Sequence, residues 1–69
     1  MIYYIGDREV TIDEYAAHDG ISDALRVARE LDVDVDVAVQ YADSLLTYDE
    51  LVSAVGADAA AAIDAAISV

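Results

Sequence analysis

The sequence predicts an α+β fold that is mostly α, with a short N-terminal β-hairpin followed by four short helices in a compact helical bundle. Three observations carry this prediction. β-Branched and aromatic residues flank a glycine turn near the N-terminus. Thr-x-x-Glu capping boxes begin at Thr11 and Thr47, and glycines follow at Gly20 and Gly56, where helices are expected to end. With 69 residues, the chain is expected to form a single small domain over 1–69.

The hairpin is expected over about residues 2–12. Its turn contains Gly6, which readily supplies the backbone angles of a tight turn. An isolated hairpin is marginal in water, so it needs helices or another chain's sheet beneath it. Tyr3 and Tyr4 are neighbours in the first strand and must face opposite ways. One of them lies outside the hairpin's own core face, and tyrosine is enriched at interfaces, so both are candidate interface residues.

Cap residues and apolar periodicity place the helices. Ser22 and Asp23 can cap the helix that follows Gly20, and Asp58 can cap the last one. No internal repeat stands out. The expected helices span about residues 13–19, 22–32, 35–46, 48–55 and 58–68.

Residues 33–41 fit two structures. Strict alternation of valine and aspartate predicts a strand with valines on one face. The helical interpretation takes Asp34 as N-cap and continues its apolar periodicity to Leu46. The length of the helical pattern favours a helix, and a strand stays the alternative.

The last expected helix carries an apolar stripe of small and branched residues. Its alanines favour helix formation but supply little core volume. Because a helix this short is marginal alone, it needs a docking surface. We expect Ile63 and Ile67 to insert into a neighbour, either the segment Val35–Leu46 or another subunit. The candidate interface residues are therefore Tyr3, Tyr4, Ile63, Ala66 and Ile67.

The charge balance is the most informative feature of the composition. The chain has 15 Asp and Glu, only three Lys and Arg, and a formal net charge of −12, yet 58% of its residues are hydrophobic. This chain has enough apolar residues to fold and is also strongly acidic. Such a combination suits a solvent in which salt screens the repulsion between charges. Aspartate exceeds glutamate, lysine is absent, and alanine and valine replace bulkier apolar residues. This composition resembles that of proteins from halophilic archaea and their viruses, which implies a high-salt cytoplasm or a virus particle as the location.

Residue types that commonly act in catalysis are scarce in this chain. There is no cysteine or lysine and one histidine, His18, so thiolate chemistry and His/Cys metal clusters are excluded. The run Asp32-x-Asp34-x-Asp36 lacks the glycine and the bidentate glutamate of a calcium loop, because Val37 and Asp43 occupy those positions. We expect no catalytic, metal or cofactor-binding residues, no small-molecule substrate and no membrane span.

Residues 24–43 resemble a helix-turn-helix. Val27, Ala28 and Leu31 match the apolar positions of a first helix, and Val33 matches the turn. Asp32 stands where glycine is usual. The second helix would present Asp34, Asp36 and Gln40 outward, although DNA affinity rests on Lys and Arg that neutralise phosphates. We therefore do not expect nucleic acid as a partner.

The sequence therefore predicts a small acidic, non-catalytic structural or interaction protein that works within a larger assembly. Its partners are other proteins or further copies of itself. A minor structural component of a haloarchaeal virus particle fits the size and the acidity. The alternative is a helix-turn-helix DNA-binding regulator. A weaker alternative is an acidic mimic of nucleic acid.

Salt should stabilise the fold. Carboxylates occur in every expected helix, and at about 1 M salt the screening length is only ~3 Å. We expect the melting temperature, followed by circular dichroism, to rise from low to molar KCl as repulsion is screened. A melting temperature that stays the same would contradict the halophilic interpretation.

Overall fold

The N-terminal hairpin pairs two short antiparallel strands, β1 (Tyr3–Ile5) and β2 (Arg8–Val10). It is seen in a computed structural model that describes residues 2–68. Gly6 closes the turn with a φ of 62°, a left-handed conformation that glycine adopts without strain. The paired residues are Tyr3 and Val10, Tyr4 and Glu9, and Ile5 and Arg8. The predicted hairpin is confirmed.

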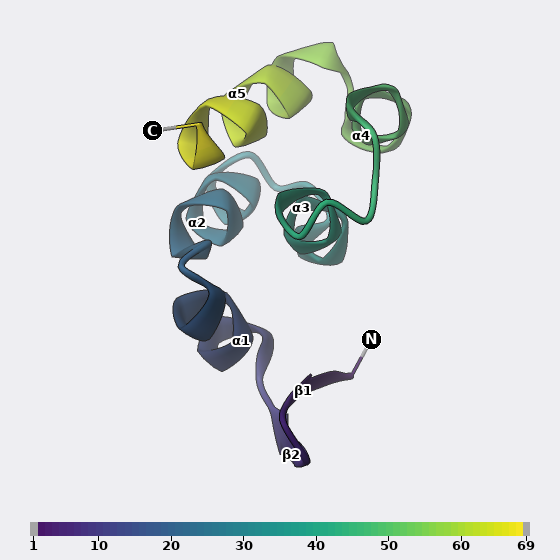
Figure 1. Ribbon diagram of the computed structural model, residues 1–69. Helices are drawn as coiled ribbons and strands as arrows, with labels where there is room; N and C mark the ends of the chain where they lie inside the picture. Colours follow the sequence, from purple (N-terminus) through teal and green to yellow (C-terminus); the bar gives the residue numbers. More distant parts are fainter. Residues whose placement is uncertain (1, 69) are drawn as a thin grey trace.

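Five helices follow within the described residues. They are α1 (Ile12–Asp19), α2 (Ser22–Glu30), α3 (Val35–Ala42), α4 (Tyr48–Val55) and α5 (Ala57–Ile67). The α+β class, mostly α, is confirmed. The number of helices exceeds the predicted bundle of four by one, and each of the five expected ranges contains a helix. The molecule measures 35 × 21 × 19 Å, with the hairpin at one end and α5 at the other (Figure 1).

Three helix starts follow the predicted caps. The hydroxyls of Thr11 and Thr47 accept from the third backbone N–H of α1 and α4, and a glutamate returns a bond in each capping box. Asp34 caps α3 by accepting from the backbone N–H of Asp36 at 2.9 Å. Residues 35–42 are therefore helical, and the strand alternative for 33–41 is wrong.

Two predicted caps are wrong. Helix α2 begins after Ile21, whose hydrocarbon side chain cannot make a cap bond. The Ile21 N–H bonds the Ala16 carbonyl at the end of α1, so the N-cap position falls on Ile21 and Ser22 is already the first helical residue. Gly56 ends α4 and also precedes α5, so Asp58 lies inside the first turn of α5. There its carboxylate favours the positive end of the helix dipole without bonding as a cap.

Residues with positive φ follow four of the helices at intervals of twelve residues, at Gly20, Asp32, Ser44 and Gly56. After α1, α2 and α3 the chain closes in the same way, with the N–H of the residue after the positive-φ residue bonding a carbonyl in the last helical turn. The sequence showed no repeat because these positions hold glycine, aspartate and serine, whereas the structure repeats a turn.

These turns shorten two predicted helices. Helix α2 ends at Glu30 instead of residue 32, because Asp32 turns left-handed and the Val33 N–H bonds the Ala28 carbonyl at 3.0 Å. Helix α3 ends at Ala42 instead of residue 46, because Ser44 turns in the same way. Leu45, predicted to lie along the apolar side of α3, is 71% exposed as a result.

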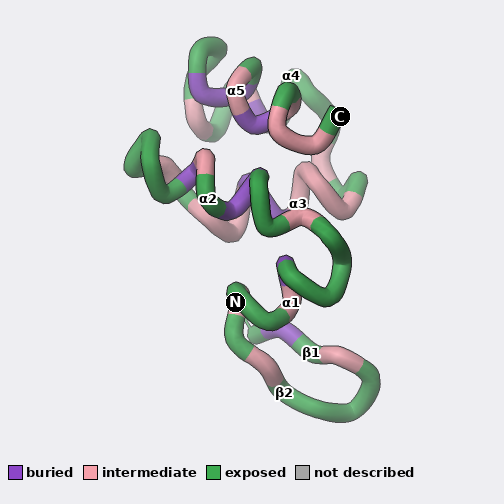
Figure 2. The backbone as a smooth tube through the Cα atoms, turned by 90° about the vertical axis from the view of Figure 1, so that its left-hand side faces the viewer, coloured by how far each residue is buried: buried purple, intermediate pink, exposed green. Residues whose placement is uncertain are grey.

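Two clusters of buried side chains form the core, and helices α2 and α3 contribute to both. The smaller cluster holds the hairpin and α1 against them, with Tyr3, Ala16, Leu25 and Val39. The larger cluster holds α4 and α5 against them, with Ala24, Ala28, Ala38, Leu51, Ala60 and Ile63. Buried residues accordingly occur in β1 and in each of the five helices, whereas the turn of the hairpin is exposed (Figure 2).

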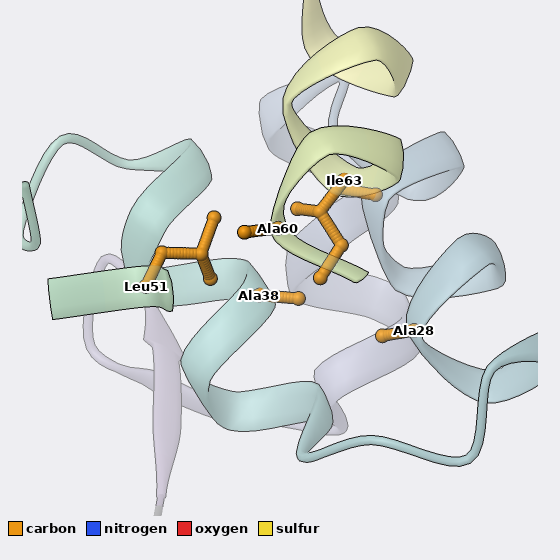
Figure 3. Close-up of a cluster of buried hydrophobic side chains, with 6 residues drawn as sticks. Ala28, Ala38, Leu51, Ala60 and Ile63 are labelled. Carbon is orange, nitrogen blue, oxygen red and sulfur yellow. The ribbon is translucent and has the colours of Figure 1, made fainter. Parts of the chain in front are cut away.

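The core of the larger cluster is built mainly from alanines, which allow the helices to approach closely. Ile63 reaches from α5 toward Ala28 of α2 and Ala38 of α3, and Leu51 of α4 points toward Ala60 (Figure 3). Ile63 is fully buried. The stripe of α5 therefore docks within the chain itself, on α2, α3 and α4.

Ile63→Ala should destabilise the fold strongly. Among alanines no neighbour can fill the space that the substitution leaves, so we expect a loss of about 2–5 kcal/mol in the free energy of unfolding. Urea unfolding in molar KCl measures it. Leu45→Ala, which removes an exposed side chain, is the matched control and should change stability by less than about 0.5 kcal/mol. Equal losses in the two variants would contradict this core.

Candidate interaction site

The two hairpin tyrosines separate as expected from a strand. Tyr3 is 8% exposed and packs against the ring of Tyr15, with ring centroids 4.9 Å apart. Tyr4 is 53% exposed on the opposite face, and Ile2, directly before β1, is also exposed. Of the two tyrosines, only Tyr4 has a side chain that can meet a partner without unfolding the chain.

Tyrosine hydroxyls tie the helices together through aspartates. The Tyr3 hydroxyl donates to Asp36 Oδ1 at 2.5 Å and so joins β1 to α3. The Tyr15 hydroxyl donates to Asp43 Oδ2 at 2.5 Å, which joins α1 to the C-cap of α3. A third bond, from Tyr41 to Asp64 Oδ1 at 2.6 Å, joins α3 to α5. All three bonds have one partner in α3 or at its end.

The same contacts shift the pKa values of the groups involved. The hydrogen bond to Asp43 raises the pKa of Tyr15 to about 12, since a phenolate cannot donate to a carboxylate. Burial raises the pKa of Tyr3, and the bond to Asp64 raises that of Tyr41. Burial also raises the pKa of Asp43, and neighbouring Asp19 raises it further, against the lowering effect of the Tyr15 bond. These hydroxyls are therefore held as donors at neutral pH.

The arginines are already paired with carboxylates of the chain. Arg29 binds Asp13 through both of its terminal nitrogens, at 2.5 and 3.0 Å, and joins α2 to α1. This bond lowers the pKa of the Asp13 carboxyl. Within α2, Arg26 lies between Asp23 and Glu30, the two pairings predicted by spacing. The last arginine, Arg8, lies 3.8 Å from Glu14.

The second half of the chain carries no basic residue. Positions 31–69 contain eight Asp and Glu and no Lys, Arg or His. Helices α3, α4 and α5 belong to this half. Any cation that neutralises their surface must therefore come from the first half, from solvent or from a partner.

A groove opens in this acidic half, between α3 and α4. Its volume is about 530 Å³. Small residues on α4, Ser53 and Ala54, leave space opposite Val37 and Gln40 of α3. The full lining is Val37, Gln40, Leu46, Asp49, Glu50, Ser53 and Ala54. We call this the α3–α4 groove.

The segment that resembles a helix-turn-helix has the turn but not the exposed helix. Asp32 adopts a φ of 56°, the left-handed conformation that glycine would take there. Helix α3, which would have to enter a DNA groove, has no exposed residue among its eight positions. Asp36, predicted to face outward, is instead held by the Tyr3 hydroxyl.

The remaining predicted interface residues lie on α5. Ile63 is buried in the chain's own core, where it shares a cluster with Ala38 of the segment Val35–Leu46. Of the two expected neighbours it therefore meets this segment within the chain, and it is not exposed as an interface residue. Ile67 packs on the same core cluster, and Ala66 is half-buried. Sequence reasoning missed the exposed Leu45 and the groove beside it, because it extended α3 through Leu46.

Three other features of the described residues bear on function: possible metal ligands, the histidine and the length of the helices. Among residues 2–68, no three His, Asp or Glu side chains come together in a way that could hold a metal ion. His18 is exposed, with its Nδ1 3.4 Å from Asp19. Across the same residues, every helix is too short or too polar to span a bilayer.

Comparison of the chain with protein-family models, curated proteins and solved structures gave no match.

Raising the pH above 10 should remove the stabilisation supplied by Tyr15. Its folded pKa of about 12 lies above the ordinary value of about 10, so its contribution is complete below pH 10 and is lost as the pH rises through 12. We expect the stability difference between the unaltered chain and Tyr15→Phe, from urea unfolding in molar KCl, to shrink between about pH 10 and 12.

The exposed Tyr4→Phe serves as the control for removal of a hydroxyl at neutral pH. It should change the free energy of unfolding by less than about 0.5 kcal/mol. A difference between Tyr15→Phe and the unaltered chain that stays constant up to pH 12 would contradict the hydrogen bond to Asp43.

Proposed function

We propose that this chain is a small non-catalytic interaction protein that works as one component of a larger protein assembly in a high-salt environment. The observation that carries the proposal is the distribution of apolar side chains. Six of the eleven buried core residues are alanines. Among residues 2–68, five large apolar residues remain on the surface: Ile2, Tyr4, Leu31, Leu45 and Tyr48.

A monomer of this size gains stability by burying its largest side chains, because apolar stabilisation scales with buried area. Here several of them are exposed, and four of these lie in two parts of the chain. Ile2 lies directly before β1 and Tyr4 lies within it. Leu45 and Tyr48 lie beside the α3–α4 groove, in or just after the α3–α4 connection. Partners that cover these residues would supply the burial that the alanine core does not.

The acidic surface supports the high-salt part of the proposal. With a net charge of −12 and three arginines already paired within the chain, the surface keeps its negative charge unless salt or a basic partner screens it. The assembly that best fits the size and this charge is a haloarchaeal virus particle, in which the chain would be a minor structural component. The virus particle or a high-salt cytoplasm is then its location.

A DNA-binding regulator is the second candidate, favoured only by the left-handed turn at Asp32. The half-buried surface of α3 and the pairing of Arg26 and Arg29 with carboxylates weigh against it, since phosphate binding needs free cations. An acidic mimic of nucleic acid is a weaker candidate that only the net charge supports.

The mass of the native particle tests the proposal. We expect the chain, produced in a halophilic host and purified in molar KCl, to sediment and scatter light with a mass well above that of one chain. Mass spectrometry would then identify the co-eluting protein or show further copies of the chain. A single-chain mass with no co-eluting protein would overturn the proposal.

Adding duplex DNA in the same measurement distinguishes the DNA-binding regulator from the interaction protein. An increase in mass with DNA that is lost in Arg26→Ala would support the regulator and contradict the interaction protein.

A further inference from the structure

The α3–α4 groove is lined by apolar and acidic residues together, and it lies in the half of the chain that has no basic residue. Val37, Leu46 and Ala54 supply its apolar surface. Asp49 and Glu50, which we call the rim carboxylates, line it from the first turn of α4. A site of this form suits a large apolar side chain accompanied by cations.

The rim carboxylates have no cationic partner among the described residues. The ion pairs among the described residues involve Arg8, Arg26, Arg29 and His18, and every carboxylate in them belongs to α1 or α2. The Glu50 carboxylate accepts from the backbone N–H of Thr47 in the capping box, where the Glu50 N–H donates in turn to the Thr47 hydroxyl oxygen. Within residues 2–68, no cation therefore pairs with the negative charge at the groove.

We propose that the groove binds a basic amphipathic segment of another protein, which inserts a large apolar side chain between α3 and α4 and places Lys or Arg against Asp49 and Glu50. This proposal rests on the proposed function and names the surface and the partner's chemistry. Leu45, 71% exposed in the adjoining connection, and Tyr48 would extend the apolar contact beyond the groove.

Charge complementarity decides between this partner and a second copy of the chain. A second copy would bring a further net charge of −12 and no lysine, and its arginines are already paired with its own carboxylates. A basic segment instead neutralises the rim. Molar salt screens distant charges, but a screening length of about 3 Å at 1 M leaves part of the attraction between groups in direct contact. Salt does not weaken the hydrophobic contribution of the partner's inserted apolar side chain.

Peptide binding tests the proposal directly. The probe is a fluorescent amphipathic peptide of about 16 residues with leucines along one helical face and lysines beside them. Fluorescence anisotropy in about 0.5 to 2 M KCl measures its affinity. Two control peptides replace the lysines by glutamates or the leucines by serines. We expect the first peptide to bind, with affinity falling as salt rises, and both controls to bind at least about tenfold more weakly.

Matched variants of the protein locate the binding. Asp49→Lys should weaken binding at least about fivefold, whereas Asp58→Lys should not, although both residues occupy the second position of a helix and change net charge equally. Ala54→Gln should fill the groove and weaken binding at least about tenfold, whereas Ala61→Gln, on the exposed side of α5, should not.

Circular dichroism shows whether each variant is folded, and Ser53→Gln provides a second way to fill the groove if Ala54→Gln is not. Absence of binding by the unaltered chain would overturn the groove proposal, as would equal effects in Asp49→Lys and Asp58→Lys. If the native particle still has a mass above one chain in these cases, the proposed function stands and only the assigned surface is wrong.

Discussion

Hydrogen bonds from tyrosine hydroxyls to aspartates hold the parts of this chain in place. A protein with fifteen acidic residues and three arginines cannot join its helices mainly by salt bridges. Tyr3, Tyr15 and Tyr41 supply neutral donors instead, and each bond has α3 or its C-cap as one partner. A neutral donor satisfies a half-buried carboxylate without requiring a second buried charge. Helix α3 is thereby fixed between the hairpin, α1 and α5.

This role of α3 explains several features together. Helix α3 contributes Val39 to one core cluster and Ala38 to the other, so it joins the two ends of the elongated molecule. A helix used in this way has no free face for DNA, which is why a segment with a suitable turn does not present a recognition helix. The surfaces left for partners lie at its margins, at the outer face of the hairpin and in the α3–α4 groove.

The alanine core gives the molecule close helix packing but little buried apolar area. Ala28, Ala38 and Ala60 let α2, α3 and α5 approach, and Ile63 fills the space among them. The large residues that a self-sufficient domain of this size would bury are partly on the surface. We therefore expect stability to depend on salt, which screens the carboxylates, and in the proposed assembly on partners that cover those residues.

The sequence by itself determined what depends on neighbouring residues. The hairpin turn at Gly6, the capping boxes at Thr11 and Thr47, and the Asp34 cap each join residues two to four positions apart, so their spacing could be recognised directly. Only the tertiary structure decided the rest. Asp32 and Ser44 end helices in a left-handed conformation that their residue types do not demand, and Ile63 could have met another subunit as well as the chain's own core. The tyrosine–aspartate bonds and the α3–α4 groove unite residues far apart along the chain, and their pairing follows from how the helices pack.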